Sequence, residues 1–257
     1  MKRVLTIAGS DSSGGAGIQA DLRVFAQLGV YGTCAVTAVT AQNSRGVQKV
    51  SKVAPRIVAA QMDSVTRDIG VDACKIGMLY SPQLVDIVAE RIHRREIANV
   101  TLDPIIFAKD GTRLLSAKGV ERMKRSLLPC VLLVAPNVGE AQILSGLEIR
   151  DAAAAAAAAK EIWKLGPKYV LIKGGHLDGE PVDVLFDGET SREFRGERVE
   201  GEPMRGTGCV LTAAITALLA QGHDIAEAVT FAKQFVATAI AKSVKLGKGG
   251  VRFYGGS

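Results

Sequence analysis

The tetrad Gly206-Thr207-Gly208-Cys209 joins a glycine-rich turn to a thiol, directly before the long apolar segment 210–221. If this segment is a helix, its first backbone N–H groups lack intrahelical partners, and the helix dipole makes that end a site for an anion such as a phosphoryl group. The same helix end favours a thiolate, so we expect a lowered pKa for Cys209. The tetrad therefore predicts an anion site with a base beside it. The alternative is a plain turn followed by a buried, inert cysteine.

Polar side chains also follow several short β-branched runs. Asp103 comes directly after residues 100–102 and could hold Mg²⁺ on a nucleotide, because such cations use one or two carboxylates; an Asp-Pro turn is the alternative. Asn137 and Glu140 stand three apart across a predicted helix start, so both side chains share one face, although Glu140 alone also suits the helix dipole. Lys173, followed by two glycines, suits a phosphate or a tight turn. Each signal is weak alone, and their joint placement predicts a site.

A second glycine-rich loop, residues 9–17, follows the first apolar run and leads into a helical pattern that carries Asp21. It lacks the lysine that a phosphate loop of the common nucleotidases places after its last glycine. Ala20 stands where the dinucleotide-binding fingerprint needs a third glycine. Neither motif is predicted, and a plain turn is the alternative to a ligand loop. The next two strands are followed by Gln42 with Asn43 and by Gly77 with Met78.

Alternating strand and helix patterns must position these residues. The predicted strands are residues 4–8, 34–41, 73–76, 100–102, 131–134 and 169–173, and the predicted helices between them are 17–28, 55–68, 82–95, 117–127, 138–144 and 152–165. Two antiparallel strands follow at 182–186 and 191–198, and then two long helices begin at Thr207 and Asp224. This alternation predicts an α/β fold whose mostly parallel sheet is flanked by helices. Ligands of such sheets bind beyond the carboxyl ends of the strands, where the polar clusters fall.

The composition narrows the class of protein. The 257 residues, 47% hydrophobic and 23% charged, contain no linker-like stretch, so we expect a single domain over residues 1–257. The net charge of +6 is scattered and aromatic residues make up only 5%, which favours anionic small molecules over nucleic acid. The four cysteines are far apart and form no C-x-x-C pair, so a reducing cytoplasm is expected, without zinc or disulfides. No apolar run approaches the roughly 20 residues of a membrane span.

Taken together, the motifs resemble the ribokinase-like small-molecule kinases, and within them the hydroxymethylpyrimidine and phosphomethylpyrimidine kinases of thiamine biosynthesis. The opening stretch and the cysteine-bearing tetrad are specific for this subgroup, since most of the wider superfamily carries aspartate at the last tetrad position. The resemblance implies a three-layer sandwich with helices on both faces of the sheet. It covers nearly the whole chain, through residues 6–11, 13–21, 40–43 and 75–78, Asp103-Pro104, Pro136-Asn137-x-x-Glu140-Ala141, residues 173–176 and the tetrad.

The resemblance implies ATP-dependent phosphorylation of 4-amino-5-hydroxymethyl-2-methylpyrimidine, and then of its monophosphate to the diphosphate. The tetrad backbone would form an anion hole, and Cys209 would take the hydroxyl proton. Gln42 would bind the pyrimidine, and Gly9, Asp21 and Met78 would complete its pocket. On the nucleotide side the implied residues are Asn137 and Glu140 for Mg²⁺ and the ATP phosphates, Asp103 near the metal, and Lys173 near the phosphates. A cytoplasmic homodimer is also implied.

Two positions depart from the family pattern. Arg205 precedes the tetrad where a histidine is common, and it could provide a further phosphate contact. Phe107 is larger than the usual aliphatic residue and could tighten the substrate pocket. Lids in such kinases are expected to exclude water, but the sequence does not predict whether the loop 109–113 closes over the substrate.

Two other functions compete with this one. Vitamin B6 kinases share the architecture, so a pyridoxal kinase is the main alternative. Members of the group that act on both substrates often carry a second cysteine on a lid loop, and Cys130 lies too far along the chain to serve. A non-catalytic protein that binds nucleic acid or another anion ranks lower.

Overall fold

The computed structural model describes residues 1–108, 110–175, 181–196 and 204–256. Its centre is a nine-stranded sheet in the order β3-β2-β1-β4-β5-β6-β7-β8-β9. Neighbouring strands from β2 to β7 pair in parallel, whereas β3, β8 and β9 pair antiparallel with β2, β7 and β8, respectively. The expectation of a mostly parallel α/β sheet is therefore confirmed. The strands are β1 (Arg3–Asp11), β2 (Tyr31–Asn43), β3 (Gly46–Lys52), β4 (Ala73–Ile76), β5 (Val100–Leu102), β6 (Leu133–Val134), β7 (Tyr169–Ile172), β8 (Val182–Phe186) and β9 (Ser191–Arg195).

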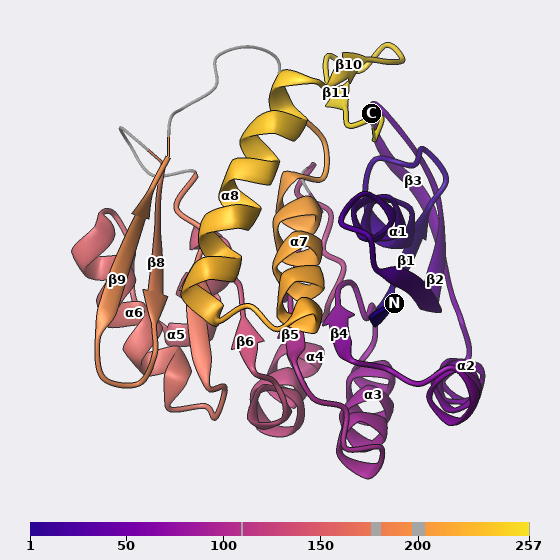
Figure 1. Cartoon of the computed structure of the whole chain (residues 1–257), viewed down its shortest axis with the longest axis horizontal. Helices are drawn as coiled ribbons and strands as arrows, with labels where there is room; N and C mark the ends of the chain where they lie inside the picture. The colour runs from indigo at the N-terminus through magenta and orange to yellow at the C-terminus, as the bar shows by residue number, and fades with distance from the viewer. Residues whose placement is uncertain (109, 176–180, 197–203, 257) are drawn as a thin grey trace.

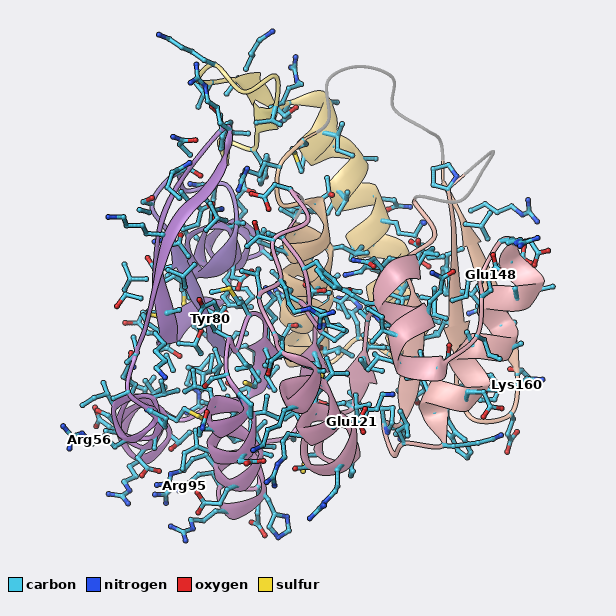
Figure 2. The ribbon with its side chains drawn as sticks, turned by 180° about the vertical axis from the view of Figure 1, so that it is seen from behind. Arg56, Tyr80, Arg95, Glu121, Glu148 and Lys160 are labelled. Atoms are coloured by element: carbon cyan, nitrogen blue, oxygen red, sulfur yellow. The ribbon has the colours of Figure 1, made fainter. Side chains whose placement is uncertain are left out.

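Helices cover both faces of this sheet, as Figure 1 and the reverse view in Figure 2 show. Successive residues of a buried strand point to opposite faces, so β7 sends Val170 and Ile172 to one hydrophobic core and Leu171 to the other. One core is closed by α1 (Gly17–Gln27), α7 (Thr207–Gln221) and α8 (Ile225–Ala241). The other is closed by α2 (Pro55–Asp68), α3 (Pro82–Arg94), α4 (Ala117–Arg122), α5 (Val138–Ser145) and α6 (Ala152–Trp163).

Helix α7 is buried on all sides, because every residue from Cys209 to Ala220 is buried. A helix that is apolar all round belongs inside the protein, and α7 packs against α1, α8 and strands β1, β4 and β5. Its first turn therefore has a fixed position relative to the sheet. The tetrad lies in that turn.

Helix α6 contains the run of eight alanines. The side chain of Asp151 caps it by accepting a hydrogen bond from the Ala154 N–H at 2.7 Å, as expected. One face, formed by Ala155, Ala158 and Ala159, is fully buried against the second core. The small side chains therefore let this helix lie close to the sheet.

Some boundaries differ from the sequence-based expectation. Strand β3 was not predicted, because residues 46–52 carry polar side chains that suit a partly exposed sheet edge. The short hairpin of β10 (Val244–Lys245) and β11 (Arg252–Phe253) was also not predicted. The helix expected over 117–127 continues past α4 as a π-helical turn, Met123–Leu127.

Three more segments end differently from the expectation. The strand expected over 131–134 is reduced to two residues, 133–134, after a turn of 3₁₀ helix. The strand expected over 191–198 ends at Arg195, and residues 197 and 198 lie outside the described residues, as does His176. Within the described ranges, no helix is both long enough and apolar enough to cross a membrane.

Candidate active site

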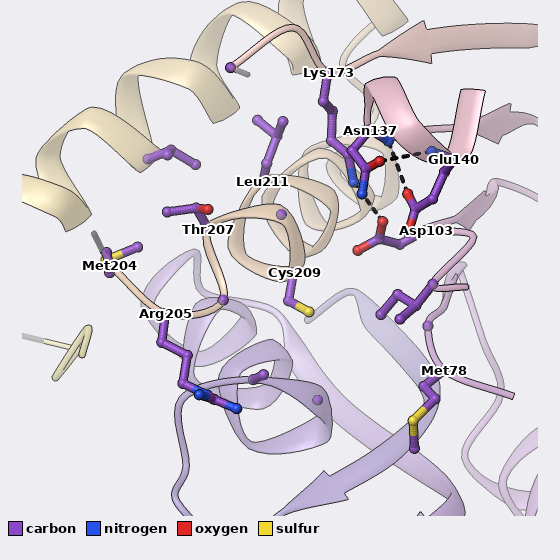
Figure 3. A pocket seen from close by; sticks show the side chains of 18 of the residues that line it. Met78, Asp103, Asn137, Glu140, Lys173, Met204, Arg205, Thr207, Cys209 and Leu211 are labelled. Atoms are coloured by element: carbon purple, nitrogen blue, oxygen red, sulfur yellow. Dashed lines mark hydrogen bonds and ion pairs between the residues drawn. The ribbon is translucent and has the colours of Figure 1, made fainter. Parts of the chain in front are cut away.

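A cavity of about 1080 Å³ opens beyond the carboxyl ends of the central strands. Figure 3 shows that its walls come from segments far apart in the sequence. The structure thus brings together the clusters that follow separate strands. All but one of the predicted site residues line it: Gly9, Gln42, Met78, Asp103, Phe107, Asn137, Glu140, Lys173, Gly206, Thr207, Gly208 and Cys209.

The tetrad turn requires glycine at its first position. Gly206 has a φ of 77°, and a Cβ there would lie 2.1 Å from the carbonyl oxygen of Gly15. This close approach joins the start of α7 to the loop that follows β1. Within α7 the Val210 N–H donates to Gly206 O at 2.9 Å, so the N–H groups of residues 207–209 have no helical acceptor. These amides are available to a bound anion.

Cys209 lies on the cavity wall, and the residue is 7% exposed. Burial raises its pKa above the ordinary thiol value, and Asp103 and Asp21 raise it further. Lys75 and the Gly17 amide act in the opposite direction without reversing the shift. The expectation of a lowered thiol pKa was therefore wrong, because the helix end lies in a desolvated site beside two carboxylates. The resting thiol is protonated at neutral pH.

A buried ion pair lies against the tetrad. Lys173 Nζ is 2.6 Å from Asp103 Oδ1, and both side chains are nearly buried. A Cβ at Gly208 would lie 3.4 Å from the same Nζ, which places the lysine beside the tetrad. Burial works to lower the pKa of Lys173, but the carboxylates of Asp103 and Glu140 raise it, so the lysine stays charged.

Asn137 and Glu140 form a capping box at the start of α5. Asn137 Oδ1 accepts from the Glu140 N–H and Glu140 Oε2 accepts from the Asn137 N–H, each at 2.9 Å. Burial raises the pKa of Glu140 to about 7, aided by Asp103 and opposed by Lys173. The two side chains therefore stabilise the helix start, as the structural alternative expected, and they also line the cavity (Figure 3).

Asp21 is the predicted site residue that does not line the cavity. It is fully buried, and its carboxylate accepts a hydrogen bond from the Thr6 hydroxyl at 2.6 Å and pairs with Lys75 at 2.7 Å. In this structure Lys75, not Asp21, reaches the cavity. Asp21 thus contributes by compensating a buried cation.

Sequence analysis missed Lys75 as a site residue. The available signal was a lone lysine inside the otherwise apolar strand Ala73–Ile76, since a lysine is almost never fully buried unless it is paired. Burial works to lower the pKa of this lysine, but Asp21, Cys209 and Asp103 together raise it, and the ammonium stays charged.

Gln42, Met78 and Phe107 line the cavity from segments that belong to or follow β2, β4 and β5. The backbone of Gln42 is held by Ser12, whose hydroxyl accepts from Gln42 N and donates to Gln42 O, both at 2.8 Å. Within the described part of the chain, no hydrogen bond uses the Gln42 side-chain amide. Phe107 is 36% exposed and lies 4.6 Å below the guanidinium of Arg113. These residues combine apolar walls with an amide available to a ligand.

A mostly parallel sheet with helices on both faces, and a glycine-rich helix start and a lysine at the carboxyl ends of its strands, defines a ribokinase-like small-molecule kinase. The model of the phosphomethylpyrimidine kinase family matches residues 11–253. The chain belongs to this family, which confirms the resemblance found in the sequence.

Relatives and solved structures agree with this assignment. A hydroxymethylpyrimidine/phosphomethylpyrimidine kinase of Aquifex aeolicus is 41% identical over 95% of this chain and 96% of its own length. The thiamine biosynthesis bifunctional protein ThiED of Geobacter sulfurreducens is 43% identical over 96% of this chain, which spans about half of that longer protein, 50%.

Two solved structures are similar. The phosphomethylpyrimidine kinase of Clostridium difficile 630 has a TM-score of 0.84 at 39% identity, covering 93% of this chain and 100% of that one. An ADP complex of Bacillus subtilis pyridoxal kinase has a TM-score of 0.92 at 39% identity, covering 99% and 97%. The fold is therefore shared by both of the substrate classes considered above.

Proposed function

We propose that this protein transfers the terminal phosphoryl group of ATP to 4-amino-5-hydroxymethyl-2-methylpyrimidine, and then to the resulting monophosphate, as a step of thiamine biosynthesis. The observation that carries the proposal is one cavity in which the start of α7 and Cys209 share walls with Gln42 and with the Lys173–Asp103 pair. The names of the family and of its full-length relatives support the choice of acceptor.

The acceptor would lie between Gln42, Met78 and Phe107. The amide of Gln42 offers a donor and an acceptor, as an aminopyrimidine requires. Met78 closes the space beside Gly9, since a Cβ on that glycine would lie 2.4 Å from Met78 Cε. Apolar walls with one polar group that fixes the orientation are typical of small-ligand sites.

In the first transfer, the acceptor hydroxyl oxygen forms a bond to the terminal phosphorus while the bond to ADP breaks, and ADP takes the electron pair. Cys209 takes the hydroxyl proton in its thiolate form. The N–H groups of residues 207–209 would stabilise charge on the transferred group, and Lys173 would neutralise nucleotide phosphates. Such transfer depends mainly on positioning and electrostatics, which a fixed helix end supplies.

The carboxylates present fit a magnesium ion that arrives on a nucleotide. Asp103 and Glu140 line the same wall as Lys173, and among the described residues no group of three or more histidine, cysteine or acidic side chains forms a metal site. Mg²⁺ on nucleotides uses one or two carboxylates together with phosphate oxygens and water. When bound, the ion would neutralise phosphate charge, and Asp103 and Glu140 would hold it.

The main alternative is a pyridoxal kinase, favoured by the likeness to the Bacillus subtilis structure. Cys130, considered above as a second cysteine, donates to Ser126 O at 3.3 Å and does not line the cavity. The position of Cys130 outside the cavity favours the pyrimidine acceptor.

A coupled assay of ATP consumption tests the proposal. The pyrimidine alcohol, its monophosphate and pyridoxal are compared as acceptors, and mass spectrometry counts the phosphates on each product. We expect the pyrimidine alcohol to gain two phosphates and to exceed pyridoxal in kcat/KM. A preference for pyridoxal would establish the alternative function. The single domain, the homodimer and the cytoplasmic location remain predictions.

A further inference from the structure

Arg205 lies directly before the tetrad, on the wall of the same cavity. Its backbone N–H donates to Arg252 O at 2.8 Å, which ties the segment to β11. Its aliphatic stem packs on the β1–α1 loop, because a Cβ at Gly15 would lie 3.0 Å from Arg205 Cδ. The side chain is 13% exposed. The position of this guanidinium is thus set by packing along its stem.

The charge of Arg205 differs from the other positive charges in the cavity. Among the described residues, five cationic side chains line it, and four of them have a carboxylate at 2.6 or 2.7 Å: Lys75 with Asp21, Lys173 with Asp103, Lys233 with Asp183 and Arg195 with Glu193. Arg205 Nε lies 4.0 Å from Asp11 Oδ2, beyond hydrogen-bond distance. Arg205 is therefore the cavity cation without a close carboxylate within the described ranges.

Asp11 is already engaged by its own loop. Its Oδ1 accepts from the N–H and hydroxyl of Ser13, and its Oδ2 accepts from the Ala16 N–H at 2.9 Å. The Nε of Arg205 is buried and has no hydrogen-bond partner among the residues that the structure describes. A buried donor without an acceptor costs roughly 1–3 kcal/mol, so the guanidinium is not held by a close partner of its own.

Arg205 lies on the acceptor side of Cys209. Figure 3 shows Cys209 between Arg205 and the group of Asp103, Lys173 and Asn137. Arg205 contacts the loop after β1, and that loop holds Gln42 through the Ser12 hydroxyl. Its charge also helps to lower the pKa of Asp110, after the larger effect of hydrogen bonds from Thr112. These neighbours belong to the acceptor end of the cavity.

We infer that Arg205 binds the phosphate group of a phosphorylated acceptor and so favours the second phosphoryl transfer. The inference rests on the proposed function. In that transfer a phosphate oxygen of the monophosphate forms a bond to the terminal phosphorus of ATP, the bond to ADP breaks, and ADP takes the electron pair. Two anionic groups must approach each other, and a guanidinium on the acceptor side reduces their repulsion. The neutral alcohol of the first transfer needs no such partner.

Steady-state kinetics of Arg205→Gln test the inference, with ATP fixed at saturation and the alcohol and the monophosphate as separate acceptors. We expect the KM for the monophosphate to rise roughly 10- to 100-fold, as for loss of a charge-assisted hydrogen bond, while the KM for the alcohol changes less than about twofold. Arg205→Lys keeps the charge and should recover part of the loss. Arg67→Gln, at an exposed arginine of α2, is the matched control and should change neither value.

Binding of the monophosphate and of ADP, measured by calorimetry on the same variants, shows whether the fold is kept. Weaker binding of the monophosphate with unchanged binding of ADP supports the inference. Equal changes for both acceptors, or none, overturn it while the proposed function stands. If Arg205→Gln fails to fold, the acceptor ratio of Arg205→Lys decides, and an unchanged ratio overturns the inference. A wild-type protein that phosphorylates neither acceptor overturns the proposed function itself.

Discussion

The cationic side chains that line the cavity differ in how close a carboxylate lies to them. Among the described residues that line it, Lys75, Lys173, Lys233 and Arg195 each have a carboxylate at 2.6 or 2.7 Å, whereas Arg205 Nε lies 4.0 Å from Asp11 Oδ2. A cation with a close carboxylate must share or exchange that partner when a ligand arrives. A cation without one attracts an anion directly. We therefore expect the paired cations to suit a ligand that brings its own cation, and Arg205 to suit a ligand that brings negative charge alone.

The largest effect is expected from removal of the base, which should lower kcat far more for the alcohol than for the monophosphate. Cys209→Ala should lower kcat for the alcohol by about 10²- to 10⁴-fold, the usual contribution of a general base. The loss for the monophosphate should be below about tenfold, because a phosphate monoester ionises near pH 6 and has no proton to give up. ATP affinity should stay similar, and Cys34→Ser is the control. Wild-type turnover of the alcohol in Cys209→Ala would remove the thiol from its role.

The proposed nucleotide contact can be removed without changing the acceptor contacts. Lys173→Met should reduce kcat/KM for ATP by about 100-fold with either acceptor, because it removes a preorganised charge near the transferred group. It also leaves Asp103 buried without its partner, which costs roughly 3 kcal/mol of the free energy of unfolding. Lys173→Met with Asp103→Asn should regain stability but not activity. A loss confined to one acceptor would contradict the assignment of Lys173 to the nucleotide.

The pH dependence should also differ between the acceptors. Burial raises the pKa of Cys209, so the thiolate fraction continues to grow above neutral pH. We expect kcat for the alcohol to rise about tenfold per pH unit from pH 6 to 8, as for a base that is mostly protonated. The rate with the monophosphate should level off above about pH 7, once its second proton is lost. Parallel profiles for both acceptors would contradict a distinct role of the thiolate.

Gln42→Leu examines recognition of the ring. A side chain that cannot pair the ring amine should weaken binding of the pyrimidine by about tenfold, equivalent to one hydrogen bond. It should also reduce discrimination against analogues that lack the amine, since these no longer leave a polar partner unpaired. Competition between the pyrimidine and an analogue that lacks the amine measures this discrimination directly. Unchanged selectivity would argue against the contact.

The smallest effect concerns Glu140. Burial raises the pKa of Glu140 from 4.5 to about 7. Between these pH values folding takes up a proton, so the free energy of unfolding falls as the pH rises through this window. Glu140→Gln keeps an oxygen for the Asn137 N–H and should lose this dependence, a difference on the order of 1 kcal/mol. Thermal unfolding at pH 5 and pH 8 compares the two proteins. A larger drop in the variant would contradict the expected protonation of Glu140.

Much of the architecture could be predicted from the sequence. The central parallel strands are short β-branched runs with strong apolar patterns, and their carboxyl ends carry the polar clusters that the structure brings together. Strand β3 could not be predicted in this way, because an edge strand has one free side and carries lysine, serine and glutamine. The β10–β11 hairpin pairs only two residues on each strand. Too few residues take part to leave a periodic pattern.

The site properties that could not be predicted from the sequence depend on tertiary contacts. The helix start gave the location of Cys209 but the wrong direction for its pKa, because the burial of the thiol and the nearby Asp103 and Asp21 depend on the tertiary fold. The resemblance placed Asp21 at the substrate, and the structure turns its carboxylate toward Lys75. Charge pairing across 54 residues of sequence leaves no local pattern.

The contact between Gly206 and the carbonyl of Gly15 has a mechanical consequence. Two stretches of main chain that touch without intervening side chains have almost no slack, so a shift of one is transmitted to the other. We therefore expect an acceptor that docks against the β1–α1 loop to shift the N–H groups of residues 207–209. Gly15 and Gly206 would then link acceptor binding to the position of these amides.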